Sequence, residues 1–241
     1  MVQQTRQYSP ARVQLIATAL RSFFRFLLQQ EAIPNDLAKA VPTAPNWRLS
    51  TLPKFMEAKD VDWLLQSCDR STSHGQRDYA ILLLLARLGL RAGEVAALTL
   101  DDVDWDAGEI VVRGKGGRRD RLPLPYDVGE ALAAYLRDSR PPSTTRQVFI
   151  RMMAPRRGFR SGVAISTIVH RRLDRAGLKP AHKGAHLLRH SLATQLLQNG
   201  ASLVEIGELL RHQDIETTRI YAKVDQETLR ALALPWPGGD V

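Results

Sequence analysis

The sequence has little cysteine, few aromatic residues and no long apolar run. Its single cysteine, Cys68, permits no disulfide within the chain and fits a reducing compartment. No apolar stretch reaches the roughly 18–20 residues that a membrane-spanning helix needs. The amino terminus lacks the basic-then-apolar order of a secretory signal. These absences predict a soluble, cytoplasmic protein, in which Cys68 is a small buried thiol.

Positive charge is in excess, and it is concentrated in one stretch. The chain has 34 Lys and Arg against 25 Asp and Glu, a formal net charge of +9. Residues 151–190 hold ten Lys or Arg and one Asp, so this stretch carries a net charge equal to that of the whole chain. A basic, merely soluble surface is one explanation. A surface that faces nucleic acid is the preferred one.

The first fifty residues predict a small helical piece followed by a linker. Apolar residues recur every three or four positions from Val13 to Leu28, as on the buried side of a helix. Ser9 and Pro10 provide a cap and a first-turn proline. A shorter helix is expected near 34–40, and the prolines in 41–53 indicate a linker.

The remainder, 54–241, predicts a mainly helical domain with one small three-stranded antiparallel sheet. The turn sequences Asp106–Gly108 and Gly114–Gly117 enclose an apolar strand over 109–113, and a further strand is expected over 119–124. The apolar periodicity predicts helices near 58–68, 76–88, 92–98, 127–138, 164–176, 187–199, 202–210, 214–222 and 225–233.

A small set of polar residues indicates phosphoryl transfer. His186 and Arg189 are three apart, so on a helix they share a face, and a guanidinium can bind two phosphate oxygens at once. Tyr221 follows 32 residues after Arg189, and a tyrosine hydroxyl can act as a covalent nucleophile. Further candidates are Arg91, Lys115 in a glycine-rich turn, and His212, nine residues before the tyrosine.

In order and spacing, this set resembles the tyrosine recombinase, or phage-integrase, family, in particular its Xer-like site-specific recombinases. The resemblance implies that Tyr221 attacks the scissile DNA phosphate and leaves a 3′-phosphotyrosyl link. It further implies that Arg91 and Arg189 hold the non-bridging oxygens and that Lys115 protonates the departing 5′-oxygen. His186 and His212 would hydrogen-bond the phosphate or carry a proton.

The resemblance also suggests supporting residues and partners. Glu94 would hold the Arg91 guanidinium, and His190 would support the catalytic residues without taking part in the chemistry itself. DNA contacts are expected from Arg12, Arg21, Arg25, Arg118 and Arg119. The expected partner is double-stranded DNA. Four copies of the chain would bind two synapsed sites as a homotetramer, and the protein without DNA would be a monomer. No metal or cofactor is expected, and the protein would associate with the nucleoid.

The two predicted domains are a partial core-binding domain over 1–50 and a catalytic domain over 54–241. Family members carry a longer amino-terminal helical domain that closes a clamp around DNA, so a shortened clamp is expected here. An integrase-derived DNA-binding protein with little or no recombination activity is therefore the alternative function. The recombinase is expected to belong to a mobile element or phage, whether it integrates, excises or resolves DNA.

Two other readings of the same residues remain open at this stage. His182, His186 and His190 are four residues apart, as zinc ligands on one helical face could be, although Lys183–Ala185 breaks the helical pattern. The predicted helices 187–199 and 202–210 also fit a helix-turn-helix regulator without catalysis. That reading leaves Arg91, Lys115 and Tyr221 without a role.

Overall fold

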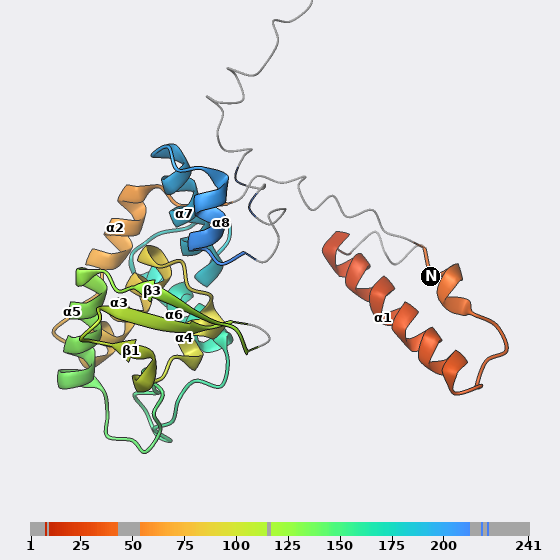
Figure 1. Cartoon of the computed structure of the whole chain (residues 1–241), viewed down its shortest axis with the longest axis horizontal. Helices are drawn as coiled ribbons and strands as arrows, with labels where there is room; N and C mark the ends of the chain where they lie inside the picture. The colour runs from red at the N-terminus through yellow and green to blue at the C-terminus, as the bar shows by residue number, and fades with distance from the viewer. Residues whose placement is uncertain are drawn as a thin grey trace, which may run out of the picture. The chain divides into compact units, whose positions relative to one another are not determined.

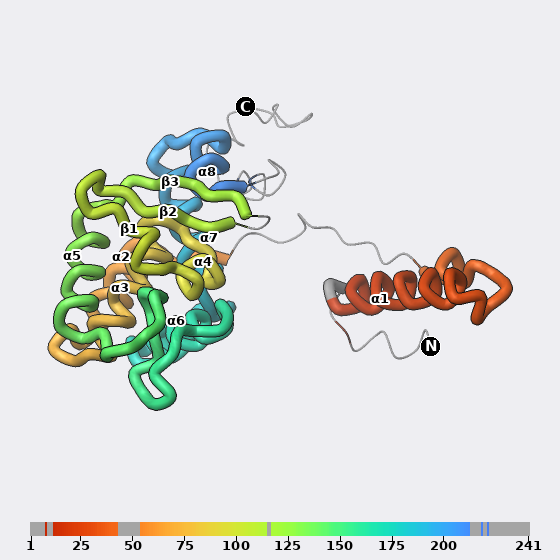
Figure 2. Tube along the Cα trace, turned by 60° about the horizontal axis from the view of Figure 1, so that its bottom comes forward, coloured from red at the N-terminus to blue at the C-terminus, as the bar shows by residue number. Residues whose placement is uncertain are grey.

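The computed structural model describes residues 8, 10–42, 54–114, 117–212, 218 and 221 of the 241-residue chain. The chain divides into two compact units, Met1–Thr51 and Leu52–Val241. Figures 1 and 2 show the two units and the course of the chain within each. The predicted helix over 225–233, that over 214–222 apart from positions 218 and 221, the Ser9 cap and most of the linker lie outside the described residues.

The first unit consists of a long helix and a short one, as predicted. The helix α1 (Pro10–Gln29) starts at its proline, and the 3-10 helix η2 (Leu37–Ala40) follows, capped by the Asp36 carboxylate. Arg21 ties the two together by donating hydrogen bonds to the carbonyls of Val41 and Pro42, at 3.1 and 3.2 Å.

Only two apolar residues of this small unit, Ala17 and Ala38, are buried among those described. Several large apolar side chains of α1 face solvent instead, namely Leu15, Ile16, Phe23 and Phe26. The unit therefore buries too little apolar surface to form a substantial core of its own.

The second unit is mainly helical, and its helices follow the predicted pattern with end shifts of up to three residues. They are α2 (Ala58–Gln66), α3 (Ser73–Arg87), α4 (Ala92–Ala97), α5 (Tyr126–Ala134), α6 (Gly162–Arg175), α7 (Ala185–Gln198) and α8 (Leu203–Leu209). The helix predicted over 127–138 changes at its end into the π-helical turn η5 (Tyr135–Ser139). No helix of the described part of the chain is long and apolar enough to span a membrane.

The sheet has the predicted three antiparallel strands, in the order β1–β2–β3. The 3-10 turn η3 (Leu100–Asp102) leads into β1 (Val103–Asp104), which pairs with β2 (Glu109–Arg113), and β2 pairs with β3 (Arg119–Pro123). The register sets Arg113 opposite Arg119, the pair of the β2–β3 hairpin that lies next to its turn. Figure 1 shows the strands side by side in the second unit.

Helix α3 forms the centre of the core. Five consecutive residues, Ile81–Leu85, are all 0–1% exposed, because neighbours surround the helix: α2, α4, α5, α6 and α7 all contact it. Cys68 is buried beside this core, as predicted, and burial raises the pKa of its thiol to about 11. Gly162 packs so closely on α4 that an added Cβ would lie 2.6 Å from the Gly93 nitrogen.

A buried ion cluster corrects the charge distribution read from the sequence. Asp78 on α3 accepts hydrogen bonds from Arg77, at 2.7 Å, and from Arg172 on α6, at 2.7 Å. Arg172 and Arg189 are buried, so they do not add to the surface charge of 151–190. The exposed cations of that stretch are Arg156, Arg157, Arg160, Arg171, Arg175, Lys179 and Lys183, and Lys183 pairs with Asp174.

Candidate active site

Helix α7 brings three of the predicted residues to one place. It begins just after Gly184 and carries His186, Arg189 and His190 on its first two turns. Arg189 is only 4% exposed. Its guanidinium donates hydrogen bonds to the carbonyls of Gly89 and Leu210. These bonds join the loop before α4 to the end of α8 through one side chain.

Glycine is needed at position 89 for this arrangement. Gly89 has φ +58°, in the left-handed region that glycine adopts most readily. An added Cβ would also lie 2.6 Å from Cδ2 of Leu210. The chain can therefore turn sharply here and present a carbonyl to Arg189.

Arg91 is held at the start of α4 by Glu94. The Glu94 carboxylate accepts a hydrogen bond from the Arg91 backbone nitrogen, at 2.8 Å, and another from its Nη1, at 2.7 Å. The Arg91 side chain remains 39% exposed, while that of Glu94 is 6% exposed. Arg91 thus combines a fixed orientation with access to solvent. The Arg91–Glu94 contact is the one that the sequence analysis expected.

Tyr221 lies next to His190. Its ring is 1% exposed and packs in a small apolar cluster with Ala193, Ile206 and Leu210. The Tyr221 hydroxyl lies 2.8 Å from Nδ1 of His190. His190 was expected to support the catalytic residues without contacting the nucleophile, so this direct contact differs from the prediction.

His212 and His186 lie in the same region. Nδ1 of His212 is 2.7 Å from Oγ1 of Thr218, a buried threonine that the sequence analysis did not single out. The rings of His186 and His190 are 6.4 Å apart. His186 is exposed at the edge of the site, whereas His212 is half-buried.

Burial and the neighbouring guanidinium groups keep the histidines neutral. Desolvation, with the charges of His186 and Arg189, lowers the pKa of His190 to about 4. Desolvation, with the charges of Arg189, Arg91, His190 and Arg211, lowers the pKa of His212 to about 4. Partial desolvation, Arg189 and Arg91 also lower the pKa of His186. At neutral pH, the rings of His190 and His212 are therefore uncharged, and each keeps a nitrogen that can accept a hydrogen bond.

The pKa of the tyrosine is shifted upward instead. Burial raises the pKa of Tyr221 to about 12, although the charge of Arg189 works against the shift. Burial lowers the pKa of Arg189 to about 10, which leaves the guanidinium charged at neutral pH. The site thus holds a protonated phenol beside a neutral imidazole, close to cationic groups. The cationic groups can bind an anion, and the phenol of Tyr221 can pass its proton to the imidazole of His190.

Arg211 is a member of this site that the sequence analysis missed. Its guanidinium, 5% exposed, lies 2.8 Å from the Glu94 carboxylate, and the Arg91 guanidinium contacts its backbone carbonyl at 3.3 Å. The only signal in the sequence is its place beside His212, and such a position gives no indication that a charged side chain is buried.

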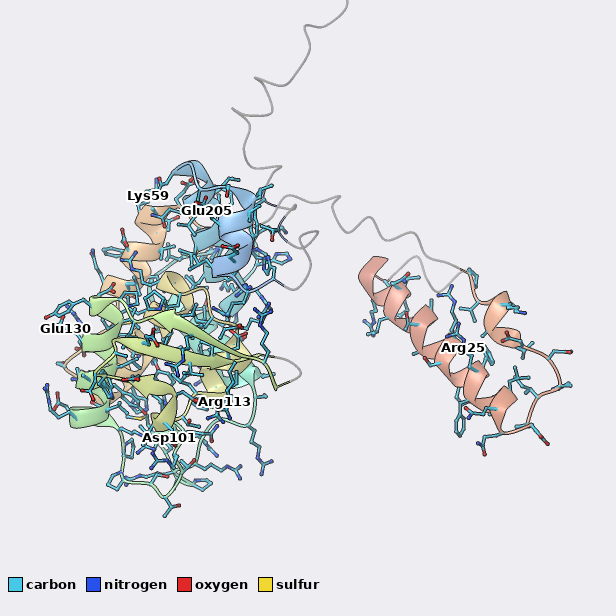
Figure 3. The ribbon with its side chains drawn as sticks, in the orientation of Figure 1. Arg25, Lys59, Asp101, Arg113, Glu130 and Glu205 are labelled. Atoms are coloured by element: carbon cyan, nitrogen blue, oxygen red, sulfur yellow. The ribbon has the colours of Figure 1, made fainter. Side chains whose placement is uncertain are left out.

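The remaining predicted residues are placed as follows. Lys115 lies outside the described residues, between the ends of β2 and β3 in the sequence. Arg113 at the end of β2 (Figure 3) binds the Asp102 carboxylate at 2.7 Å and anchors the end of the strand that leads to position 115. Arg118 and Arg119 are exposed, and Arg118 pairs with Asp120. Arg25 on α1 is exposed (Figure 3), and Arg12 lies over the Tyr8 ring.

Neither of the rival readings gains support from these contacts. His190 binds Tyr221, and His182 lies outside α7, with Nδ1 3.1 Å from the Lys54 ammonium. Within the described ranges, no group of three potential ligands could hold a metal ion. In a helix-turn-helix, α8 would face DNA, but its exposed side carries Glu205 and Glu208, which phosphates repel.

The model of the phage integrase family matches residues 54–228, most of the chain. The chain belongs to this family. The putative integrase/recombinase y4rA of Sinorhizobium fredii is 53% identical to it over 94% of this chain and 55% of that protein. The tyrosine recombinase XerD of Listeria innocua is 34% identical over 92% of this chain and 74% of that protein.

The fold agrees with the family assignment. The XerH site-specific recombinase, solved with a palindromic difH substrate after cleavage, matches 95% of this chain and 68% of that one, with a TM-score of 0.77 and 24% identity. The chain spans about half the length of y4rA and of a second integrase/recombinase of the same organism, y4rF.

Proposed function

We propose that this phage-integrase-family chain cuts and rejoins DNA strands through a covalent link to Tyr221. The observation that carries the proposal is the contact of the Tyr221 hydroxyl with His190, in a site that also contains Arg91, Arg189 and His212. A nucleophile, a proton acceptor and phosphate-binding cations are the groups that such a phosphoryl transfer needs.

The proposed step balances in bonds and protons. The Tyr221 oxygen forms a bond to phosphorus while the bond to the 5′-oxygen of the next nucleotide breaks, which leaves a 3′-phosphotyrosyl link. The phenolic proton passes to Nδ1 of His190, and Lys115 gives a proton to the departing oxygen. Attack by a 5′-hydroxyl on the link reverses the step and rejoins the strand.

The two guanidinium groups divide the work of holding the phosphate. Arg189 uses two of its five N–H donors on the carbonyls of Gly89 and Leu210, so its orientation is set while donors remain for a phosphate oxygen. Arg91, oriented by Glu94, is accessible from solvent. Together they stabilise the charge that builds on the non-bridging oxygens, with His186 and His212 as additional hydrogen-bonding groups.

The proposed partner is double-stranded DNA, bound by both units. The first unit would contribute Arg12 and Arg25 as part of a core-binding clamp, and the second would contribute Arg118, Arg119 and the exposed cations of 151–190. By analogy with the family, four copies assemble on two synapsed duplexes. The integrase/recombinase names of the relatives favour a role in the movement of a mobile element or phage.

A nicked suicide substrate tests the function. The chain would be incubated in EDTA with a pool of nicked duplexes of random sequence, and covalent adducts would be resolved on a denaturing gel. The chain is expected to form an adduct, and Tyr221→Phe, which removes only the hydroxyl, is expected to form none while it binds DNA equally well. Sequencing of the trapped DNA would then give the target site.

Two other outcomes would change the assignment. An adduct with Tyr221→Phe would place the nucleophile elsewhere. DNA binding without an adduct from the unaltered chain would favour the alternative function, an integrase-derived DNA-binding protein.

A further inference from the structure

Arg211 has an unusual backbone and an unusual environment. Its φ is +55°, a conformation that glycine adopts far more readily than arginine. Its side chain is nevertheless buried, and its Nε has no hydrogen-bond partner in the described part of the chain. A residue kept in an unfavourable conformation, with a charged side chain turned inward, calls for a compensating interaction.

The compensating interaction is with Glu94. Oε2 of Glu94 accepts from Nη2 of Arg211, at 2.8 Å, and from the backbone nitrogen of Arg91, while Oε1 accepts from the Arg91 guanidinium. Nη1 of Arg211 donates to the Leu209 carbonyl at 3.3 Å. One buried carboxylate is thus shared by two arginines, one buried and one open to solvent.

The charges of the site show what this sharing achieves. Arg91 and Arg189 provide two positive charges, but Glu94, which orients Arg91, brings a negative charge into the same site. Arg211 offsets that negative charge. The site keeps a net of two positive charges to meet a phosphate whose negative charge grows in the transition state.

We propose that Arg211 is a positioning residue that neutralises Glu94, so that Arg91 is held in place without weakening the attraction of the site for phosphate. The inference rests on the proposed function, because the phosphate in question is the scissile phosphate of DNA. Arg211 acts through Glu94 and Arg91 and is not assigned a contact with the substrate.

Three substitutions separate charge from backbone effects. Arg211→Gly relieves the left-handed backbone and leaves Glu94 paired with Arg91, so the chain is expected to fold. Arg211→Gln removes the charge but keeps much of the side-chain volume, and Arg211→Lys keeps the charge. Glu31→Gly is the matched control, since Glu31 also has φ +55° but lies in the first unit.

The first measurement is the rate of covalent adduct formation with the nicked duplex at saturating protein. Arg211→Gly and Arg211→Gln should lower this rate by about 10–100-fold, the loss that removal of a residue supporting the ligands causes at metal sites. Arg211→Lys should retain most of the rate, and Glu31→Gly all of it. Millimolar guanidinium should restore part of the activity of Arg211→Gly, and the DNA dissociation constant should change much less than the rate.

The second measurement needs no DNA cleavage. Desolvation lowers the pKa of His212 most, and the charges of Arg189, Arg91, His190 and, last, Arg211 lower it further. An NMR titration should therefore show a raised His212 pKa in Arg211→Gly and Arg211→Gln, but not in Arg211→Lys or Glu31→Gly. This titration decides the inference even if the unaltered chain forms no adduct, an outcome that would overturn the proposed function alone.

The proposal would be overturned by an unchanged His212 pKa in the two charge-removing variants. Cleavage by them at the unaltered rate would overturn it equally. If Arg211→Gly fails to fold, Arg211→Gln decides by the same two measurements.

Discussion

Nδ1 of His190 lies 2.8 Å from the hydroxyl oxygen of Tyr221, although 31 residues separate them in the chain. Because the pKa of His190 is lowered to about 4 and that of Tyr221 is raised to about 12, the shared proton belongs to the phenol at neutral pH. The phenol therefore donates and the imidazole accepts. Burial makes the tyrosine a weak nucleophile until the proton can leave, and His190 is the acceptor in contact with it.

Replacement of His190 tests this relation. His190→Ala removes the proton acceptor and is expected to slow adduct formation by about 10²–10⁴-fold, the usual contribution of a general base. DNA affinity should remain unchanged, because His190 is neutral and half-buried. Single-turnover cleavage together with a binding titration measures both quantities. His74→Ala, on the surface of α3, is the control.

The histidine pKa values predict an unusual pH dependence. An ordinary histidine base would give a rise in rate centred near pH 6.5. Here His190 and His212 have a pKa of about 4, so both are already deprotonated above pH 5. Single-turnover cleavage should therefore show no inflection from His190 or His212 between pH 5.5 and 8. An inflection near 6.5 that disappears in His190→Ala would contradict this.

The same shifts affect stability in acid. The folded-state pKa of each ring lies below the unfolded value, so the unfolded chain takes up protons first as the pH falls. The second unit should thus lose stability between about pH 6.5 and 4, and thermal unfolding over that range measures the loss. His190→Ala should flatten the dependence, and an unchanged slope would contradict the lowered pKa.

Arg189→Lys tests the planar guanidinium. A lysine keeps the charge but has one nitrogen in place of the two, Nη1 and Nη2, that bind the carbonyls of Gly89 and Leu210, and it lacks the planar group that can bind two phosphate oxygens. Cleavage is expected to fall by about 10²–10³-fold, with most of the DNA affinity retained. If affinity falls as far as the rate, Arg189 serves ground-state binding instead.

Lys115 carries a prediction from the sequence alone. Lys115→Ala should abolish cleavage of an ordinary duplex, since the departing oxygen then lacks a proton donor. A duplex with a bridging 5′-sulfur at the scissile position should restore cleavage, because a thiolate leaves without a proton. Failure of the sulfur substrate to restore activity would remove Lys115 from this role.

The first unit is expected to bind DNA through its exposed arginines. Arg25→Ala should weaken binding and lower the slope of the salt dependence by about one unit, with cleavage at saturation unchanged. Arg21→Ala should instead lower the stability of this unit, because Arg21 joins α1 to the residues after η2. Salt titrations and thermal unfolding distinguish the two effects.

The sequence predicted local structure well, because local structure depends on neighbours in the chain. Apolar spacing located α1 and α7, and turn residues located the hairpin between β2 and β3. The i, i+3 spacing also placed His186 and Arg189 together on α7. These inferences need only the period of a helix or strand and the conformations that glycine allows.

What escaped prediction depends on partners far away in the sequence. Arg172 was counted with the DNA-facing charge, but Asp78, 94 residues away, pairs with it in the interior. The contact of His190 with Tyr221 and that of Arg211 with Glu94 likewise join distant segments. No local pattern distinguishes an arginine that faces solvent from one that pairs with a buried carboxylate.

The position of Tyr221 has a consequence for a mixed assembly. Its hydroxyl lies 2.8 Å from Nδ1 of His190, and the charge of Arg189 acts on its pKa. We therefore predict that the nucleophile and the phosphate-binding arginine act within one subunit. Tyr221→Phe, which cannot form the covalent link, and Arg189→Lys, which is strongly slowed, should then fail to restore each other's activity when mixed.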